Sequence, residues 1–136
     1  MSAIEKISVG GTSYDVGVQH GVYELWYNND LTTFAGQDIN ISDDYDTYIV
    51  ECGDTAGSVI GVAFVEHGKN SYATYITFRI DGTVRFSWRN CTSTTGKITF
   101  SDCTRRTVTL TTGVANDSTV NSELIPLRVL GIKHNN

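Results

Sequence analysis

Residues 74–88 read TYITFRIDGTVRFSW, and this stretch decides the fold class of the chain. Apolar and polar residues alternate on both sides of Gly82, which is typical of two strands joined by a tight turn. A two-residue turn would bring apolar and polar residues onto the same face. A three-residue loop over 80–82 instead pairs Phe78 with Val84 and gives Gly82 the left-handed position that such loops need. We therefore predict a β-hairpin in this register.

The predicted hairpin has two different faces. One face is apolar and holds Ile76, Phe78, Val84, Phe86 and Trp88. The other face, which we take as the outer one, holds Tyr75, Thr77, Arg79, Arg85, Ser87 and Arg89. A solvated sheet face is the simplest interpretation of the second set, because Thr and Arg suit an exposed strand. The alternative is that Tyr75 and the three arginines contact an anionic glycan or a neighbouring subunit.

Similar alternating runs, punctuated by thirteen glycines, continue along the 136 residues, and no amphipathic helix pattern is present. This predicts an all-β fold, a single-domain antiparallel β-sandwich of the jelly-roll kind over 1–136. A second hairpin is expected around Gly10-Gly11, with Val9 opposite Thr12. The strands are predicted at 4–9, 12–18, 22–27, 37–41, 47–52, 58–66, 73–80, 83–89, 97–101, 105–111 and 123–133, and the longest loops at 29–38 and 111–122.

Two segments are apolar on both sides of their predicted strands. They are SVIGVAFVEH at 58–67 and LIPLRVLGIK at 124–133, and in the second only Arg128 interrupts the two apolar faces. A strand of this kind is either central in a sandwich or buried against another chain. We expect the last strand to close the core, with Pro126 at its start or on an edge. Whether a second subunit covers its other face is left open by the sequence.

The composition argues against several classes of partner. The net charge of −5 disfavours nucleic acid, because binding a phosphate backbone needs clustered Lys and Arg. No apolar run reaches 18 residues, so no membrane insertion is expected. The start of the chain lacks the apolar core of a secretory signal. Cys52, Cys91 and Cys103 have no CxxC spacing, and we expect reduced, buried thiols, with a Cys91–Cys103 bridge as the alternative.

Candidates for catalysis or metal binding are few. The three histidines, His20, His67 and His134, lack metal-ligand spacing, and no nucleophile, phosphate or dinucleotide motif is present. The acidic run Asp43–Asp46 favours a turn before a strand, with a calcium site as the alternative, because it lacks the glycine and closing glutamate of an EF-hand. We therefore expect a protein that is not an enzyme and has no catalytic residue, metal or cofactor.

Residues 24–52, ELWYNNDLTTFAGQDINISDDYDTYIVEC, resemble a segment common in virion proteins of phages and prophages of gut bacteria. The matching positions are Leu25, Trp26, Phe34, Ala35, Gln37, Ile39, Ile41, Tyr45, Ile49 and Val50. The chain end is similar to an IPxxVxGIK ending in such proteins, through Ile125, Pro126, Val129, Gly131, Ile132 and Lys133. The start, IEKISVGGTSYDV, also resembles the opening of many phage structural proteins. Together these segments cover somewhat more than a third of the chain.

This resemblance implies the all-β head domain of a tail-fibre or receptor-binding protein, a homotrimer that binds carbohydrate on the host surface. It implies contacts with other virion proteins and a location on the virion, after synthesis in the bacterial cytoplasm. Such fibres carry a long shaft that this chain lacks, which favours a head fibre, a capsid decoration protein or a tail-fibre tip. In that case the hairpin within 1–20 would dock on the particle.

The aromatic residues Trp26, Tyr27, Tyr72 and Tyr75 are candidates for stacking on sugars, with a place in the core or a subunit interface as the alternative. Two competing functions remain open. A free carbohydrate-binding module without virion context would be a monomer with one aromatic-lined groove. A small hydrolase would bring two carboxylates, or a cysteine and a histidine, together in a cleft.

Overall fold

The computed structural model describes residues 6–15 and 21–133. Within these ranges the chain forms twelve strands and no helix. The strands are β1 (Lys6–Val9), β2 (Thr12–Asp15), β3 (Gly21–Tyr27), β4 (Gln37–Asn40), β5 (Thr47–Gly53), β6 (Val59–Glu66), β7 (Asn70–Phe78), β8 (Thr83–Thr94), β9 (Lys97–Phe100), β10 (Thr104–Thr109), β11 (Ala115–Thr119) and β12 (Ile125–Lys133). The predicted all-β antiparallel sandwich is confirmed.

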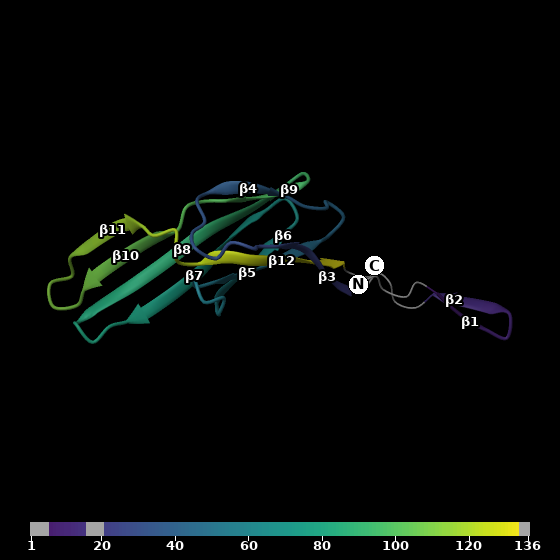
Figure 1. Ribbon diagram of the computed structural model, residues 1–136, viewed down its shortest axis with the longest axis horizontal. Helices are drawn as coiled ribbons and strands as arrows, with labels where there is room; N and C mark the ends of the chain where they lie inside the picture. The colour runs from purple at the N-terminus through teal and green to yellow at the C-terminus, as the bar shows by residue number, and fades with distance from the viewer. Residues whose placement is uncertain (1–5, 16–20, 134–136) are drawn as a thin grey trace.

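Two antiparallel sheets make up the sandwich (Figure 1). The first sheet has the order β3-β12-β5-β6, and the second has the order β11-β10-β8-β9-β4 with β7 on the other side of β8. The long strand β8 organises the second sheet, because it pairs with β7 along one edge and with both β10 and β9 along the other. The hairpin β1–β2 forms a small sheet of its own.

The core lies between the two sheets and is built from alternate residues of their strands. The fully buried members include Val50, Cys52, Val65, Cys91, Ile98, Leu124, Ile125 and Val129. β12 lies between β3 and β5, so the last strand does close the core, as expected. Pro126 is its second residue and sits at a register shift, where the missing N–H of proline is tolerated.

Both predicted hairpins have the expected register. Phe78 pairs with Val84, the N–H of Arg79 donates to the carbonyl of Thr83 at 3.0 Å, and Gly82 has φ of +80°. In the first hairpin Val9 pairs with Thr12, across two glycines with positive φ. The predicted strand ends at 4–5 and 16–18 lie outside the described residues.

The assignment of faces in the 74–88 hairpin is wrong. Ile76, Phe78, Phe86 and Trp88 are on the outward side, where Val84 alone of this set is buried, and the set with Arg85, Ser87 and Arg89 points toward the first sheet. The reason is that β7, β8, β10 and β11 reach past the start of β12, so the far end of this ribbon has no opposing sheet to cover apolar side chains (Figure 1). Where the sheets do meet, small side chains such as Ala73 and Cys91 fill the narrow space.

The predicted loop over 111–122 is also wrong in part, because it contains β11. This strand pairs with β10 from Thr104–Thr119 to Val108–Ala115. Its sequence, ANDST, is polar and every residue in it is exposed. Backbone pairing at the sheet edge therefore forms this strand, and neither β-propensity nor alternation marks it in the sequence.

Candidate binding and assembly surface

The outward side chains of β7 and β8 form one continuous exposed surface, which we call the outer ribbon face. Its exposed or half-buried members are Tyr72, Thr74, Ile76, Phe78, Phe86 and Trp88, with Ile80 from the loop that follows β7, and Val84 on the same side is buried. Cross-strand pairs hold its members side by side, from Phe78–Val84 through Ile76–Phe86 to Thr74–Trp88. Phe78 is 79% exposed and Ile76 is 52% exposed. Side chains of this type are usually inside a protein, so their gathering on one face marks an interaction site.

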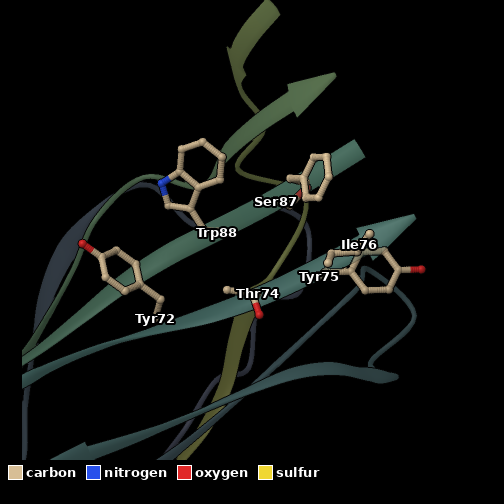
Figure 2. Close-up of a pocket in the computed structure, with 7 residues that line it drawn as sticks. Tyr72, Thr74, Tyr75, Ile76, Ser87 and Trp88 are labelled. Atoms are coloured by element: carbon tan, nitrogen blue, oxygen red, sulfur yellow. The ribbon is translucent and has the colours of Figure 1, made fainter. Parts of the chain in front are cut away.

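A shallow groove of about 470 Å³ lies within the outer ribbon face. Its lining residues are Tyr72, Thr74, Tyr75, Ile76, Phe86, Ser87 and Trp88. Figure 2 shows the rings of Tyr72 and Trp88 on the same side of the ribbon, and Thr74, on β7 with Tyr72, is the cross-strand partner of Trp88. The groove is mostly apolar, so it suits a flat apolar surface or a bulky apolar side chain.

The charged groups around the outer ribbon face are paired. Arg106 donates two hydrogen bonds to Asp117, at 2.7 Å and 2.8 Å, and its guanidinium lies 5.5 Å from the centre of the Trp88 ring. These hydrogen bonds hold the pKa of Asp117 below its ordinary value. In the loop after β7, Arg79 lies 3.5 Å from Asp81. The apolar surface is therefore bordered by neutral pairs, which a partner can approach without meeting an isolated charge.

The structure places the predicted aromatic contact residues in different environments. Tyr72 and Tyr75 line the groove, but Tyr75 is half-buried and packs against the core. Trp26 also packs against the core, with its ring edge-on to Phe34 at 6.2 Å. Tyr27 is 59% exposed and belongs to the other sheet.

The predicted arginines also have different environments. Arg79 is exposed in the loop after β7, and Arg85 is half-buried on the inner side of β8. Arg89 is fully buried and donates hydrogen bonds to the carbonyls of Leu124, Ser101 and Glu123 at 2.8, 2.6 and 3.3 Å. Burial lowers the pKa of Arg89. Arg89 therefore fixes the segment before β12, and its assignment as a glycan contact is wrong.

Sequence reasoning missed Ile76, Phe86 and Trp88 as surface residues because it placed them in the core. A signal was present in β8 itself. On the opposite side of this strand Ser87, Cys91 and Ser93 are small, and small side chains suit close packing between two sheets. The small set therefore identifies the inner face better than the large apolar set does.

The outward side of the first sheet also exposes apolar residues. We call this surface the outer sheet face, made of Ile49, Val59, Val62, Phe64 and Leu130. Phe64, Ile49 and Leu130 follow one another across β6, β5 and β12. Phe64 is 64% exposed and Val59 is 50% exposed. The two segments predicted to be apolar on both sides thus bury one side in the core and present the other outward.

A smaller pocket of about 220 Å³ lies beside the outer sheet face. Its lining includes Tyr27, Asn28, Glu51 and Arg128. Arg128 donates two hydrogen bonds to Glu51, at 2.7 Å and 3.1 Å, and these bonds raise the pKa of Arg128. An exposed aromatic ring beside paired polar groups is an arrangement that suits a hydroxyl-rich ligand.

In the acidic run at 43–46, Asp43 connects two other segments of the fold. Asp43 contacts the Nε2 atom of His67 at 2.8 Å and accepts a hydrogen bond from the N–H of Gly96 at 3.2 Å. These two hydrogen bonds, chiefly that from Gly96, hold the pKa of Asp43 below its ordinary value. Asp43 and His67 are 24 residues apart in the sequence and meet only through the fold. Within 6–15 and 21–133, no group of three or more His, Cys, Asp and Glu residues is placed to hold a metal.

The three cysteines are free and buried, as predicted, so Cys91 and Cys103 do not form a bridge. Burial raises the pKa of Cys91 to about 12 and that of Cys103 to about 11. A thiol with such a pKa is a poor nucleophile at neutral pH, because the thiolate is the reactive form.

Comparisons of the chain with protein-family models, with curated proteins and with solved structures found no match. In the described part of the chain, no helix is long and apolar enough to cross a membrane.

Proposed function

We propose that this chain is a bacteriophage virion structural protein that assembles with copies of itself and adheres to glycans on the host surface. Within a virion it would serve as a head fibre, a capsid decoration protein or a tail-fibre tip. The phage context rests on the sequence resemblance at 24–52 and 125–133. The assembly role rests on the structure, and the exposed outer ribbon face is the observation that carries it.

The size of the outer ribbon face supports assembly. Its most exposed members, Tyr72, Ile76, Phe78, Ile80 and Phe86, leave on the order of 600 Å² uncovered, given that one aromatic side chain carries roughly 150–250 Å². Monomeric proteins rarely leave a larger apolar patch than this, and a stable interface covers about 800 Å² per partner. A partner that covers this face would therefore gain most of the apolar burial that a specific complex needs.

Adhesion to glycans has a separate place on the molecule. The pocket beside Tyr27 offers an aromatic ring for stacking, and the Glu51–Arg128 pair offers acceptors and donors for hydroxyl groups. This pocket lies on the first sheet, away from the outer ribbon face, and Val59 of the outer sheet face is part of its lining. We assign Tyr27 to glycan contact and Tyr72 to subunit contact.

The test of the assembly role is the mass of the full chain in solution, measured by light scattering during size exclusion. The proposed homotrimer has three times the chain mass of 14.9 kDa. A species of 14.9 kDa at every concentration would overturn the assembly role. Adhesion is tested by binding of the chain to purified surface polysaccharide of gut bacteria, where Tyr27→Ala should lose binding and Tyr14→Ala, in the separate first hairpin, should keep it.

A second candidate is a free carbohydrate-binding module, and the groove between Tyr72 and Trp88 favours it. In that case the groove itself stacks on a sugar, with the Thr74 hydroxyl as a polar contact. This candidate predicts a monomer whose binding to glucose, galactose or N-acetylglucosamine is lost in Trp88→Ala. An assembled chain with no sugar binding at the groove would reject it.

A further inference from the structure

The two sheets each present an apolar outer surface, and these surfaces point away from each other on opposite sides of the sandwich. The outer ribbon face is formed by β7 and β8, and the outer sheet face by β5, β6 and β12. We propose that the outer sheet face of one copy docks on the outer ribbon face of the next, so that copies associate head to tail. This inference rests on the proposed self-assembly and specifies its interface.

Pairing of like faces would leave an apolar surface exposed. Two copies joined through their outer ribbon faces would still present Val59, Val62 and Phe64 to water, and these are 50%, 39% and 64% exposed. Head-to-tail contact covers both surfaces of every interior copy with a single type of interface. Because the two surfaces differ in residues and shape, such a contact is heterologous.

The shapes of the two surfaces are complementary. The outer ribbon face contains the 470 Å³ groove between Tyr72, Phe86 and Trp88. The outer sheet face projects Phe64 from the middle of β6, with Val62 beside it on the same side of the strand. A phenyl ring seated between aromatic side chains is favourable beyond its buried area alone. Phe64 of one copy therefore suits the groove of the next.

The charges near both surfaces are compatible with this contact. The Arg106–Asp117 pair borders the outer ribbon face, and the Glu51–Arg128 pair borders the outer sheet face. Each pair is hydrogen-bonded within its own copy, so docking leaves neither pair with an unpaired charge. Glu24, beside Leu130, and Glu66, two positions after Phe64, are exposed acidic side chains at the edge of the outer sheet face. The rotation between successive copies then decides whether the contacts close into a ring or continue as a filament.

Mixing two interface variants tests the inference. Val62→Ser/Phe64→Ser removes the outer sheet face, and Ile76→Ser/Phe78→Ser removes the outer ribbon face. All four side chains are exposed, so each variant should fold, which circular dichroism and a melting curve would show. Each variant alone should have the chain mass of 14.9 kDa. An equal mixture should give a species of twice that mass, because each partner keeps the one face that the other lacks.

The outcomes separate this inference from the proposed function. Val114→Ser, in the turn between β10 and β11 and outside both faces, is the control and should keep the wild-type mass. If the wild-type chain assembles but either double variant keeps the wild-type mass, or the mixture stays at the chain mass, the head-to-tail contact is wrong. If the wild-type chain is itself a monomer, both the head-to-tail contact and the proposed self-assembly are wrong.

Discussion

The two ends of β8 show how one strand can serve two purposes. From Arg89 to Ser93 its inner residues are buried against the first sheet, and Arg89 donates hydrogen bonds to backbone carbonyls of the fold. From Thr83 to Trp88 it belongs to a ribbon that extends past the first sheet, and Phe86 and Trp88 are on its outward side. Alternating apolar residues therefore do not reveal whether one side of a strand faces the opposing sheet or the outside of the molecule.

The buried end should be the most sensitive to mutation. Arg89→Ala leaves a cavity and removes the hydrogen-bond donors to the carbonyls of Leu124, Ser101 and Glu123. We therefore expect the free energy of unfolding to fall by about 4 kcal/mol. Urea unfolding followed by circular dichroism measures this loss. The matched control Arg106→Ala removes an exposed arginine and should cost at most about 1 kcal/mol. Equal losses for the two variants would contradict the proposed role of Arg89.

Ile125 tests the same end from the first sheet. It is fully buried at the start of β12, and truncation to alanine should lower the free energy of unfolding by about 3 kcal/mol. The paired measurement is Ile132→Ala, at a half-buried outward position of the same strand, which should cost clearly less. A larger effect at Ile132 would mean that the inner side of β12 is not the main core contact.

The Asp43–His67 contact predicts a dependence on acid. The pKa of Asp43 is lowered below its ordinary value of 3.8 in the folded protein, so its contribution is present above that value. The contribution is lost as pH falls through the lowered pKa, because protonation is easier in the unfolded chain. The free energy of unfolding of Asp43→Asn should therefore fall less than that of the wild type below about pH 4, because the variant lacks the carboxyl group whose pKa differs between the folded and unfolded chains. Melting temperatures of both proteins between neutral pH and acid should converge, and parallel curves would contradict the prediction.

The outward end of β8 should show the smallest effect on folding. Phe78→Ser removes a side chain that is 79% exposed, so the free energy of unfolding should change by at most about 0.5 kcal/mol. The measurement belongs in the Val62→Ser/Phe64→Ser background, because assembly would otherwise add to the apparent stability. A loss of several kcal/mol there would show that Phe78 packs within its own copy.

Local sequence patterns predicted the parts of the fold that local chemistry controls. The Gly10-Gly11 and Gly82 turns fixed two registers, because few residues other than glycine adopt their backbone conformations. The apolar C-terminal segment identified a core strand. Strand β11 could not be predicted, since its polar residues are held only by pairing with β10. The exposed face of β8 could not be predicted either, because it depends on where the first sheet ends.

The candidate site was predicted only in part for the same reason. Tyr72 was selected for its aromatic ring and does line the groove, but its neighbours Phe86 and Trp88 had been placed inside. Arg89 was selected for its charge, although its guanidinium is hydrogen-bonded to three backbone carbonyls within the fold. Residue type alone does not separate a ligand contact from a structural anchor, and burial decides between them.

The burial of the three thiols affects how the folded chain responds to oxidants. Oxidants and thiol reagents attack the thiolate form, and burial keeps Cys52, Cys91 and Cys103 protonated and out of reach. The folded protein can therefore pass from a reducing to an oxidising medium without crosslinking or oxidative damage at these positions. The covalent structure at these three cysteines is therefore the same in reducing and in oxidising media.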